Sequence, residues 1–125
     1  MNDSPVHFQD LFATAGALAG AAVPPGLDSR DLLPTLKGAG APPAAPLYWE
    51  FHERGSAEAV RFGRWKAIRS PMQTGAVRLY DLTDDPGETR DLAGAPDHAE
   101  RVQAAMQIMD GAHVPSVDFK SPAER

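Results

Sequence analysis

The stretch LYWEFHERGSAEAVRFGRWKAIRS, residues 47–70, decides the fold. Its aromatic residues alternate with polar ones, a pattern typical of half-buried β-strands. It predicts a first strand at 47–53 and a hairpin with arms at 58–62 and 65–70. Gly63 is the first central residue of the two-residue connection, where glycine favours a type II′ turn. We therefore expect three consecutive antiparallel strands.

The first strand presents different chemistry on its two faces, because successive side chains of a strand point to opposite sides. One face holds Leu47, Trp49 and Phe51, and the other holds Tyr48, Glu50 and His52. The polar face has two interpretations, a packing interface or contact with a substrate, and the packing interface is the simpler one. Tyr48, Glu50 and His52 are the candidate residues for a substrate pocket.

Two further segments complete the predicted sheet domain. A fourth strand is expected at 77–82, and a helix is expected from Pro96 to about Asp110. The apolar positions of that helix repeat at helical spacing and form one stripe, which covers one face of the sheet. The core of this stripe is Ala99, Val102, Met106 and Met109. The fold class is α+β, with a small four-stranded antiparallel sheet covered by a C-terminal helix.

The front of the chain predicts an N-terminal helix and a Pro/Gly-rich linker. Ser4 followed by Pro5 is a helix-start signal, and Gly20 is a natural end. Asp28 or Ser29 is expected to cap a second, shorter helix that ends at Gly38. The first helix carries an apolar stripe that needs a partner. Its members are Phe8, Leu11, Phe12, Ala15, Leu18 and Ala19.

The acidic segment LYDLTDDPGETRDLA, residues 79–93, is a candidate for either a calcium loop or a turn. Calcium loops need glycine at their sixth position and a bidentate glutamate at their twelfth, where this chain has Pro86 and Leu92. A Pro86-Gly87 pair instead favours a type II turn with positive φ at the glycine. Asp84 and Asp85 are expected to accept hydrogen bonds from nearby backbone N–H groups.

The composition argues against several function classes. The formal net charge of −5 over 125 residues disfavours a nucleic-acid partner, and no apolar run approaches the length of a membrane span. The N-terminus lacks the pattern of a signal peptide. The sequence does not indicate a localisation. The sequence has no cysteine, and its four histidines lack zinc-binding spacing. We predict no catalytic residue and no metal ligand in this chain.

Four basic residues cluster in the hairpin: Arg61, Arg64, Lys66 and Arg69. Their simplest interpretation is a solvated or ion-paired surface. If they border a cleft, they can also attract an anionic substrate.

The order and spacing of these motifs resemble the C-terminal subdomain of the sulfatase family, the arylsulfatase-like enzymes of the alkaline phosphatase superfamily. Residues 47–70 and 79–93 match its sheet, and the segment 7–38 is similar to the helix and loop that precede it. The resemblance spans 6–119. This sequence departs from the family pattern at Ala13, where proline is usual, and at Ser29, where glycine is usual.

The resemblance implies three segments. Residues 1–46 correspond to the connection from a catalytic domain, 47–119 to the C-terminal subdomain, and 120–125 to a tail. The family's C-x-P-S-R or S-x-P-S-R motif, the source of formylglycine, does not occur here. Formylglycine and calcium are therefore expected only in a full-length parent, and the chain alone is expected to be inactive. In that parent it contributes fold stability and one wall of the substrate pocket.

Three hypotheses remain open about function. The chain is a sulfatase C-terminal fragment, a free-standing interaction or assembly module, or a fragment of a related phosphoesterase. Its partner is then the missing catalytic domain or a second copy of the chain, bound through the face formed by Phe8, Leu11 and Phe12. Neither nucleic acid nor membrane is expected as a partner.

Overall fold

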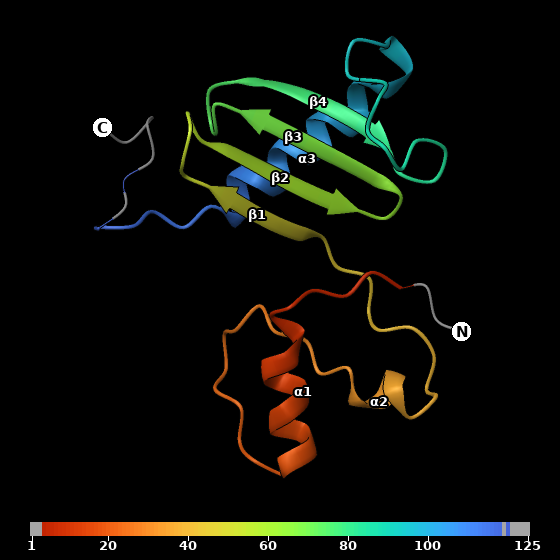
Figure 1. The fold of residues 1–125 in the computed structure, drawn as a ribbon, viewed down its shortest axis with the longest axis vertical. Helices are drawn as coiled ribbons and strands as arrows, with labels where there is room; N and C mark the ends of the chain where they lie inside the picture. The colour runs from red at the N-terminus through yellow and green to blue at the C-terminus, as the bar shows by residue number, and fades with distance from the viewer. Residues whose placement is uncertain (1–3, 119, 121–125) are drawn as a thin grey trace. The chain divides into compact units, whose positions relative to one another are not determined.

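The computed structural model describes residues 4–118 and 120, so of the predicted tail only Lys120 is described. The chain divides into two compact units, the first ending at Ala44 and the second beginning at Ala45 (Figure 1). The second unit is the predicted α+β fold, a four-stranded antiparallel sheet with one helix on one face. No helix in the described part of the chain has the length and apolarity needed to cross a bilayer.

The sheet follows the order of the sequence, and each strand pairs with the next in antiparallel fashion. Its strands are β1 (Leu47–Phe51), β2 (Ala57–Phe62), β3 (Trp65–Ser70) and β4 (Ala76–Asp81). Gly63 has a φ of 59° while Arg64 does not have a positive φ, as a type II′ turn requires. This tight connection sets the register of the hairpin, which places Val60 opposite Ala67.

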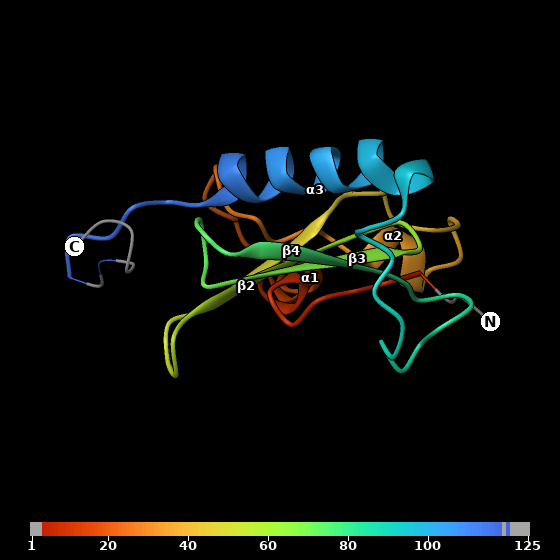
Figure 2. The same cartoon turned by 90° about the horizontal axis from the view of Figure 1, so that it is seen from above.

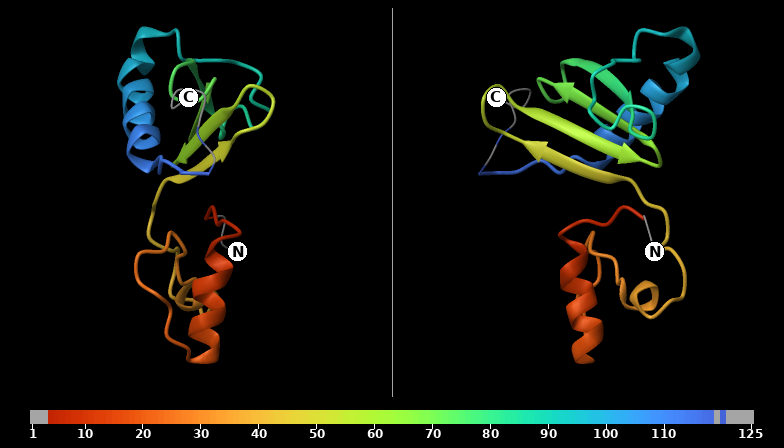
Figure 3. Two further views of the ribbon diagram at one scale, coloured as in Figure 1. Left: turned by 90° about the vertical axis from the view of Figure 1, so that its left-hand side faces the viewer. Right: turned by 45° about the vertical axis from the view of Figure 1, so that its right-hand side comes forward.

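Helix α3 (Ala99–Ala112) follows a short 3₁₀ turn, Pro96–His98, and lies along one face of the sheet (Figures 2 and 3). The core lies between the two layers. It consists of fully buried side chains from three strands and the helix: Val60, Ala67, Leu79, Ala105 and Met109. Ala99, predicted to belong to the buried stripe, is exposed, because the part of the helix packed against the core begins at Val102.

The first turn of α3 is held at the sheet by Trp65. The ring of His98 lies 5.3 Å from the ring of Trp65, centroid to centroid, and the guanidinium of Arg101 lies 4.8 Å from the Trp65 centroid. A cation over an indole ring is an attractive arrangement. Packing in the middle of the helix is thus supplemented by aromatic contacts at its start.

The first unit contains α1 (Asp10–Ala19) and the single-turn helix α2 (Leu33–Leu36). Helix α1 ends at Gly20 with a φ of 65°, as predicted. It begins at Asp10, and the predicted start at Ser4-Pro5 is wrong. Residues 4–7 have no regular secondary structure.

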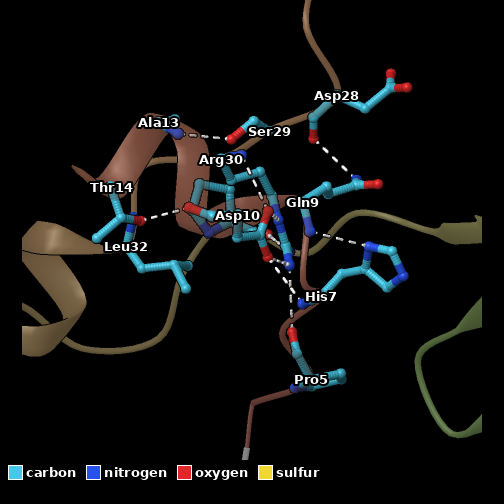
Figure 4. Close-up of polar contacts among 11 residues, drawn as sticks. Pro5, His7, Gln9, Asp10, Ala13, Thr14, Asp28, Ser29, Arg30 and Leu32 are labelled. Carbon is cyan, nitrogen blue, oxygen red and sulfur yellow. Dashed lines mark hydrogen bonds and ion pairs between the residues drawn. The ribbon is translucent and has the colours of Figure 1, made fainter. Parts of the chain in front are cut away.

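Asp10 explains the late start of α1 (Figure 4). Its buried carboxylate accepts a 2.6 Å hydrogen bond from Arg30 Nη2 and 3.0 Å hydrogen bonds from the backbone N–H groups of His7 and Arg30. Arg30 Nη2 also donates to the carbonyl oxygen of Pro5 at 3.3 Å. A residue 20 positions away therefore holds the entry segment outside the helix, which a local capping signal cannot reveal.

The predicted caps of the second helix are also wrong. The N-cap residue of α2 is Leu32, which makes no capping side-chain hydrogen bond, and the carboxylate of Asp31 accepts the N–H of Leu33 at 2.8 Å. Ser29 is used elsewhere, because its hydroxyl accepts the backbone N–H of Ala13 in α1 at 2.8 Å. The serine thus joins the loop to α1.

The loop after β4 contains a turn at Pro86 and Gly87, but it is not type II. Gly87 does not have a positive φ, whereas Glu88 does, at 55°. The carboxylate of Asp85 accepts the backbone N–H groups of Thr89 and Arg90 at 2.8 and 2.9 Å, which turns the chain at Glu88 instead. The side chain of Asp84 pairs with Arg64, so only the prediction for Asp85 is confirmed.

The apolar stripe of α1 is exposed. The large side chains Phe8, Phe12, Leu11 and Leu18 are 82%, 60%, 59% and 66% exposed, respectively. The buried residues of the helix are instead Asp10, Ala13 and Thr14. The first unit therefore folds around the polar Asp10 cluster and leaves its most apolar surface uncovered.

We predict that the stability of the first unit depends on the ionisation of Asp10. Burial alone would raise the pKa of Asp10, but hydrogen bonds from Arg30 and from the backbone of His7 and Arg30 lower it from 3.8 to about 2. A lowered folded-state pKa gives stability that is present above pH 3.8 and is lost as the pH falls through about 2. The amide NMR signals of Ala13 and Leu32 should report this loss.

The control for this prediction is a matched carboxylate. Asp10→Asn should remove most of the pH dependence between pH 4 and 2, whereas Asp28→Asn, an exposed residue of the same unit, should preserve it. An unchanged acid transition in Asp10→Asn would show that Asp10 does not control this unit.

Candidate functional site

The side chains of Tyr48, Glu50 and His52 meet, as the strand alternation predicts. The hydroxyl oxygen of Tyr48 lies 2.8 Å from Glu50 Oε1, and Nε2 of His52 lies 3.0 Å from Glu50 Oε2. They lie on the face that α3 covers, since Tyr48 pairs with Val60 in the register and packs against the buried core. The candidate pocket residues therefore border the interior of the second unit.

Two carboxylates face each other on this side of the sheet. Glu50 of β1 lies directly opposite Glu58 of β2, and Glu58 is only 1% exposed. Like charges directly opposite in a sheet are destabilising unless other groups compensate them. The Tyr48 hydroxyl lies between the two, 2.9 Å from Glu58 Oε2. Burial, together with both carboxylates, strongly raises the pKa of Tyr48, so it remains a neutral hydrogen-bond donor.

Arg69 compensates the charge of Glu58. Its Nε donates to Glu58 Oε1 at 2.7 Å, and its Nη2 donates to Asp110 of α3 at 2.5 Å. The backbone N–H of Gln73 also donates to Glu58. Arg69 is only 3% exposed, so the expected solvated surface is wrong for this residue, although it is ion-paired.

The residue that follows α3 contacts Glu50. Nδ1 of His113, the residue after the helix, lies 2.7 Å from Glu50 Oε1. Burial alone would raise the pKa of Glu50, but the contacts with His113 and Tyr48 outweigh it and lower that pKa. Glu50 is therefore a stable anion that ties β1 to the end of α3.

Three members of this cluster are absent from the sequence-based prediction: Glu58, Arg69 and His113. The sequence does contain a pattern that predicts the contact between Glu58 and Arg69. Counting outward from the Gly63-Arg64 turn places Glu58 opposite Arg69, an oppositely charged cross-strand pair. His113 lies 63 positions from Glu50, and no local pattern joins them.

The arrangement is suited to stabilisation more than to chemistry. The Tyr48 hydroxyl and the Glu58 and Arg69 side chains are engaged with one another. The His52 side chain is 38% exposed and that of Glu50 is 20% exposed, so these two border solvent. A role of Tyr48, Glu50 and His52 as substrate contacts stays a prediction.

The acidic residues do not form a metal centre in the part of the chain that the structure describes, where no three His, Cys, Asp or Glu side chains gather suitably. Asp81 is paired with Arg64, and Asp85 is engaged with the backbone of its own loop. These residues do not fit the calcium that the family resemblance implies for a parent protein.

We predict that Arg69→Met destabilises the second unit by about 3–5 kcal/mol, because it leaves the Glu58 charge buried without its partner. Arg78→Met is the matched control. Arg78 is exposed in β4, so its replacement should change the free energy of unfolding by less than about 0.5 kcal/mol. Urea denaturation followed by tryptophan fluorescence measures both.

Adding Glu58→Gln to Arg69→Met should cost less than the sum of the two single changes, because the double variant buries no unpaired charge. A loss for Arg69→Met as small as that of the control would contradict a central role for this pair.

No protein-family model matches the sequence. Solved structures do. The structure named as that of BT1596, a 2-O GAG sulfatase, is 30% identical, with a TM-score of 0.66 over 82% of this chain and 23% of its own. Ps i-CgsB is 27% identical, with a TM-score of 0.74 over 96% of this chain and 26% of its own.

A third match is the phosphonate monoester hydrolase of Agrobacterium radiobacter, 25% identical with a TM-score of 0.60, over 84% of this chain and 25% of its own. The chain spans about a quarter of the length of each of these proteins. The sulfatase matches confirm the resemblance found in the sequence, and the chain has the fold and sequence features of the C-terminal subdomain of the sulfatase family.

Proposed function

We propose that the chain acts as the C-terminal part of a sulfuric ester hydrolase. The observation that carries this proposal is the match to sulfatases at up to 30% identity over most of this chain and about a quarter of theirs. Hydrolysis would then be carried out by a catalytic portion that supplies formylglycine and calcium. This chain would support that portion.

The substrate class of the parent follows from the same matches. One matched protein is named as a 2-O GAG sulfatase, and Ps i-CgsB is solved in complex with k-i-k-neocarrahexaose. Both names refer to carbohydrates. We therefore propose a carbohydrate sulfate as the substrate of the parent.

The apolar face formed by Phe8, which precedes α1, and by Leu11 and Phe12 of α1 would pack against the catalytic portion. All three side chains are more than half exposed in the described structure. Covering a large apolar side chain gains about 1.5–3 kcal/mol. The alternative partner is a second copy of the chain, bound through the same face as a free-standing module.

The three candidate pocket residues contribute unequally to this proposal. Tyr48 and Glu50 hold the sheet and α3 together through contacts with Glu58 and His113. These contacts support a role in fold stability. His52 has the most exposed side chain of the three candidates and is the best candidate for the proposed pocket wall.

A related phosphoesterase is the second candidate function. The phosphonate monoester hydrolase matches the chain nearly as well as the sulfatases do. Sulfate, phosphate and phosphonate esters all place negative charge on non-bridging oxygens, so one fold can support several of these reactions.

The test is an assay of the full-length parent gene product on 4-nitrophenyl sulfate, 4-nitrophenyl phosphate and a phenyl phosphonate ester. We expect preference for the sulfate ester, and no turnover of any ester by this chain alone above a calcium-only blank. Preference for the phosphonate would establish the second candidate. Turnover by the isolated chain, lost in His52→Ala, would overturn the division of roles.

We predict that the exposed α1 face causes the isolated chain to self-associate. In sedimentation velocity, Leu11→Ser combined with Phe12→Ser should reduce concentration-dependent association. Leu36→Ser is the control, since this leucine is 70% exposed but lies outside α1. A wild-type chain that stays folded and monomeric at all concentrations would count against burial of this face by either partner.

A further inference from the structure

An open groove lies on the face of the sheet opposite α3. Its volume is about 520 Å³, and its walls come from β1, β2, β3 and the loop after β4. The strand residues point away from the core, because they alternate with the buried Val60 and Ala67. The lining side chains are Trp49, Ala59, Arg61, Lys66, Leu82, Pro86 and Glu88.

Two positive charges face each other in this groove. Arg61 of β2 lies directly opposite Lys66 of β3. Such a pair is destabilising, so its presence requires compensation or a use. Lys66 is compensated, because its Nζ lies 2.6 Å from Glu88 Oε1.

Arg61 is not compensated. Within residues 4–118 and 120, its side chain makes no hydrogen bond or ion pair, and its Nε is buried without a partner. A buried N–H group that lacks an acceptor loses free energy relative to water. The opposite face differs, because there Arg69 pairs with Glu58 and a ring nitrogen of His113 contacts Glu50.

The loop after β4 contributes Pro86 and Glu88 to the groove lining. Glu88 has a φ of 55°, a conformation that side-chain-bearing residues adopt infrequently, and the contacts of Asp85 hold the turn in place. This position directs Glu88 to Lys66. Once those two are paired, the groove retains the single positive charge of Arg61.

We propose that this groove binds a sugar ring that carries an anionic substituent, a sulfate or a carboxylate. Arg61 donates hydrogen bonds to the oxyanion, for which a planar guanidinium is well suited. Trp49 supplies aromatic surface for the apolar face of the ring. The link to the parent rests on the proposed function: the bound ring is a part of the carbohydrate substrate other than the ester that is cleaved.

The experiment is an NMR titration of the full chain with four probes: glucose 6-sulfate, glucuronate, glucose and sodium sulfate. The signals to follow are the Trp49 indole N–H and the amides of Arg61 and Lys66. We expect at least one anionic sugar to bind with a dissociation constant of about 1 mM, and glucose and sodium sulfate to bind at least about tenfold more weakly. Comparison of the first two probes distinguishes sulfate from carboxylate.

Variants locate the site. Arg61→Gln should weaken binding by about tenfold or more, as expected for loss of a charge-assisted contact, while Arg78→Gln should leave it unchanged. Arg78 has the same charge and lies on the same sheet face, outside the groove lining. Because Arg61 has no partner among the described residues, Arg61→Gln should unfold at the same or a higher urea concentration than the wild type.

Three results would overturn the proposal: no binding of either anionic sugar, equal binding to Arg61→Gln, or binding of sodium sulfate as strong as that of the sugars. Binding is measured without hydrolysis, so its failure leaves the proposed sulfatase role standing. Failure of the parent to cleave a sulfate ester, with binding intact, would overturn the proposed function alone.

Discussion

The buried ion pair between Glu58 and Arg69 connects every layer of the second unit. It joins the two central strands, it reaches α3 through Asp110, and it reaches β1 through the Tyr48 hydroxyl. A buried charge is tolerated only when it is paired and hydrogen-bonded, so these partners must all be in place together. Apolar packing around Leu79 supplies favourable burial, and the contact of Arg69 with Asp110 adds a polar link between this face of the sheet and the helix.

Each face of the sheet has a like-charged cross-strand pair, but the two pairs differ in the partners that surround them. On the face under α3, the opposing carboxylates are surrounded by compensating groups. On the other face, Lys66 has a partner and Arg61 has none among the described residues. Two like charges directly opposite in a sheet break a local rule of strand pairing. Such exceptions without internal compensation are expected at functional surfaces. The helix-covered face therefore holds the interactions that maintain the fold, with His52 bordering solvent, and the open face offers a further surface for recognition.

The sequence was sufficient for those elements whose causes are local. The alternation in residues 47–70 and the turn at Gly63 predict the strands and their register. One error arises where a distant group decides the geometry, because Asp10 bonds a residue 20 positions away. The other arises from a local competitor, because Asp85 accepts the N–H groups of Thr89 and Arg90 and turns the chain at Glu88. The polar cluster was only partly predictable, because apolar groups on both faces of β1 leave the position of α3 undetermined.

Native-state hydrogen exchange tests the central claim most directly, by comparing the wild-type chain with Arg69→Met. If the Glu58–Arg69 pair holds the helix to the sheet, amides of α3 (Ala99–Ala112) lose protection together with those of β2 and β3. The result that would contradict this account is α3 protection that stays at its wild-type level in Arg69→Met. In that case apolar packing alone would position the helix.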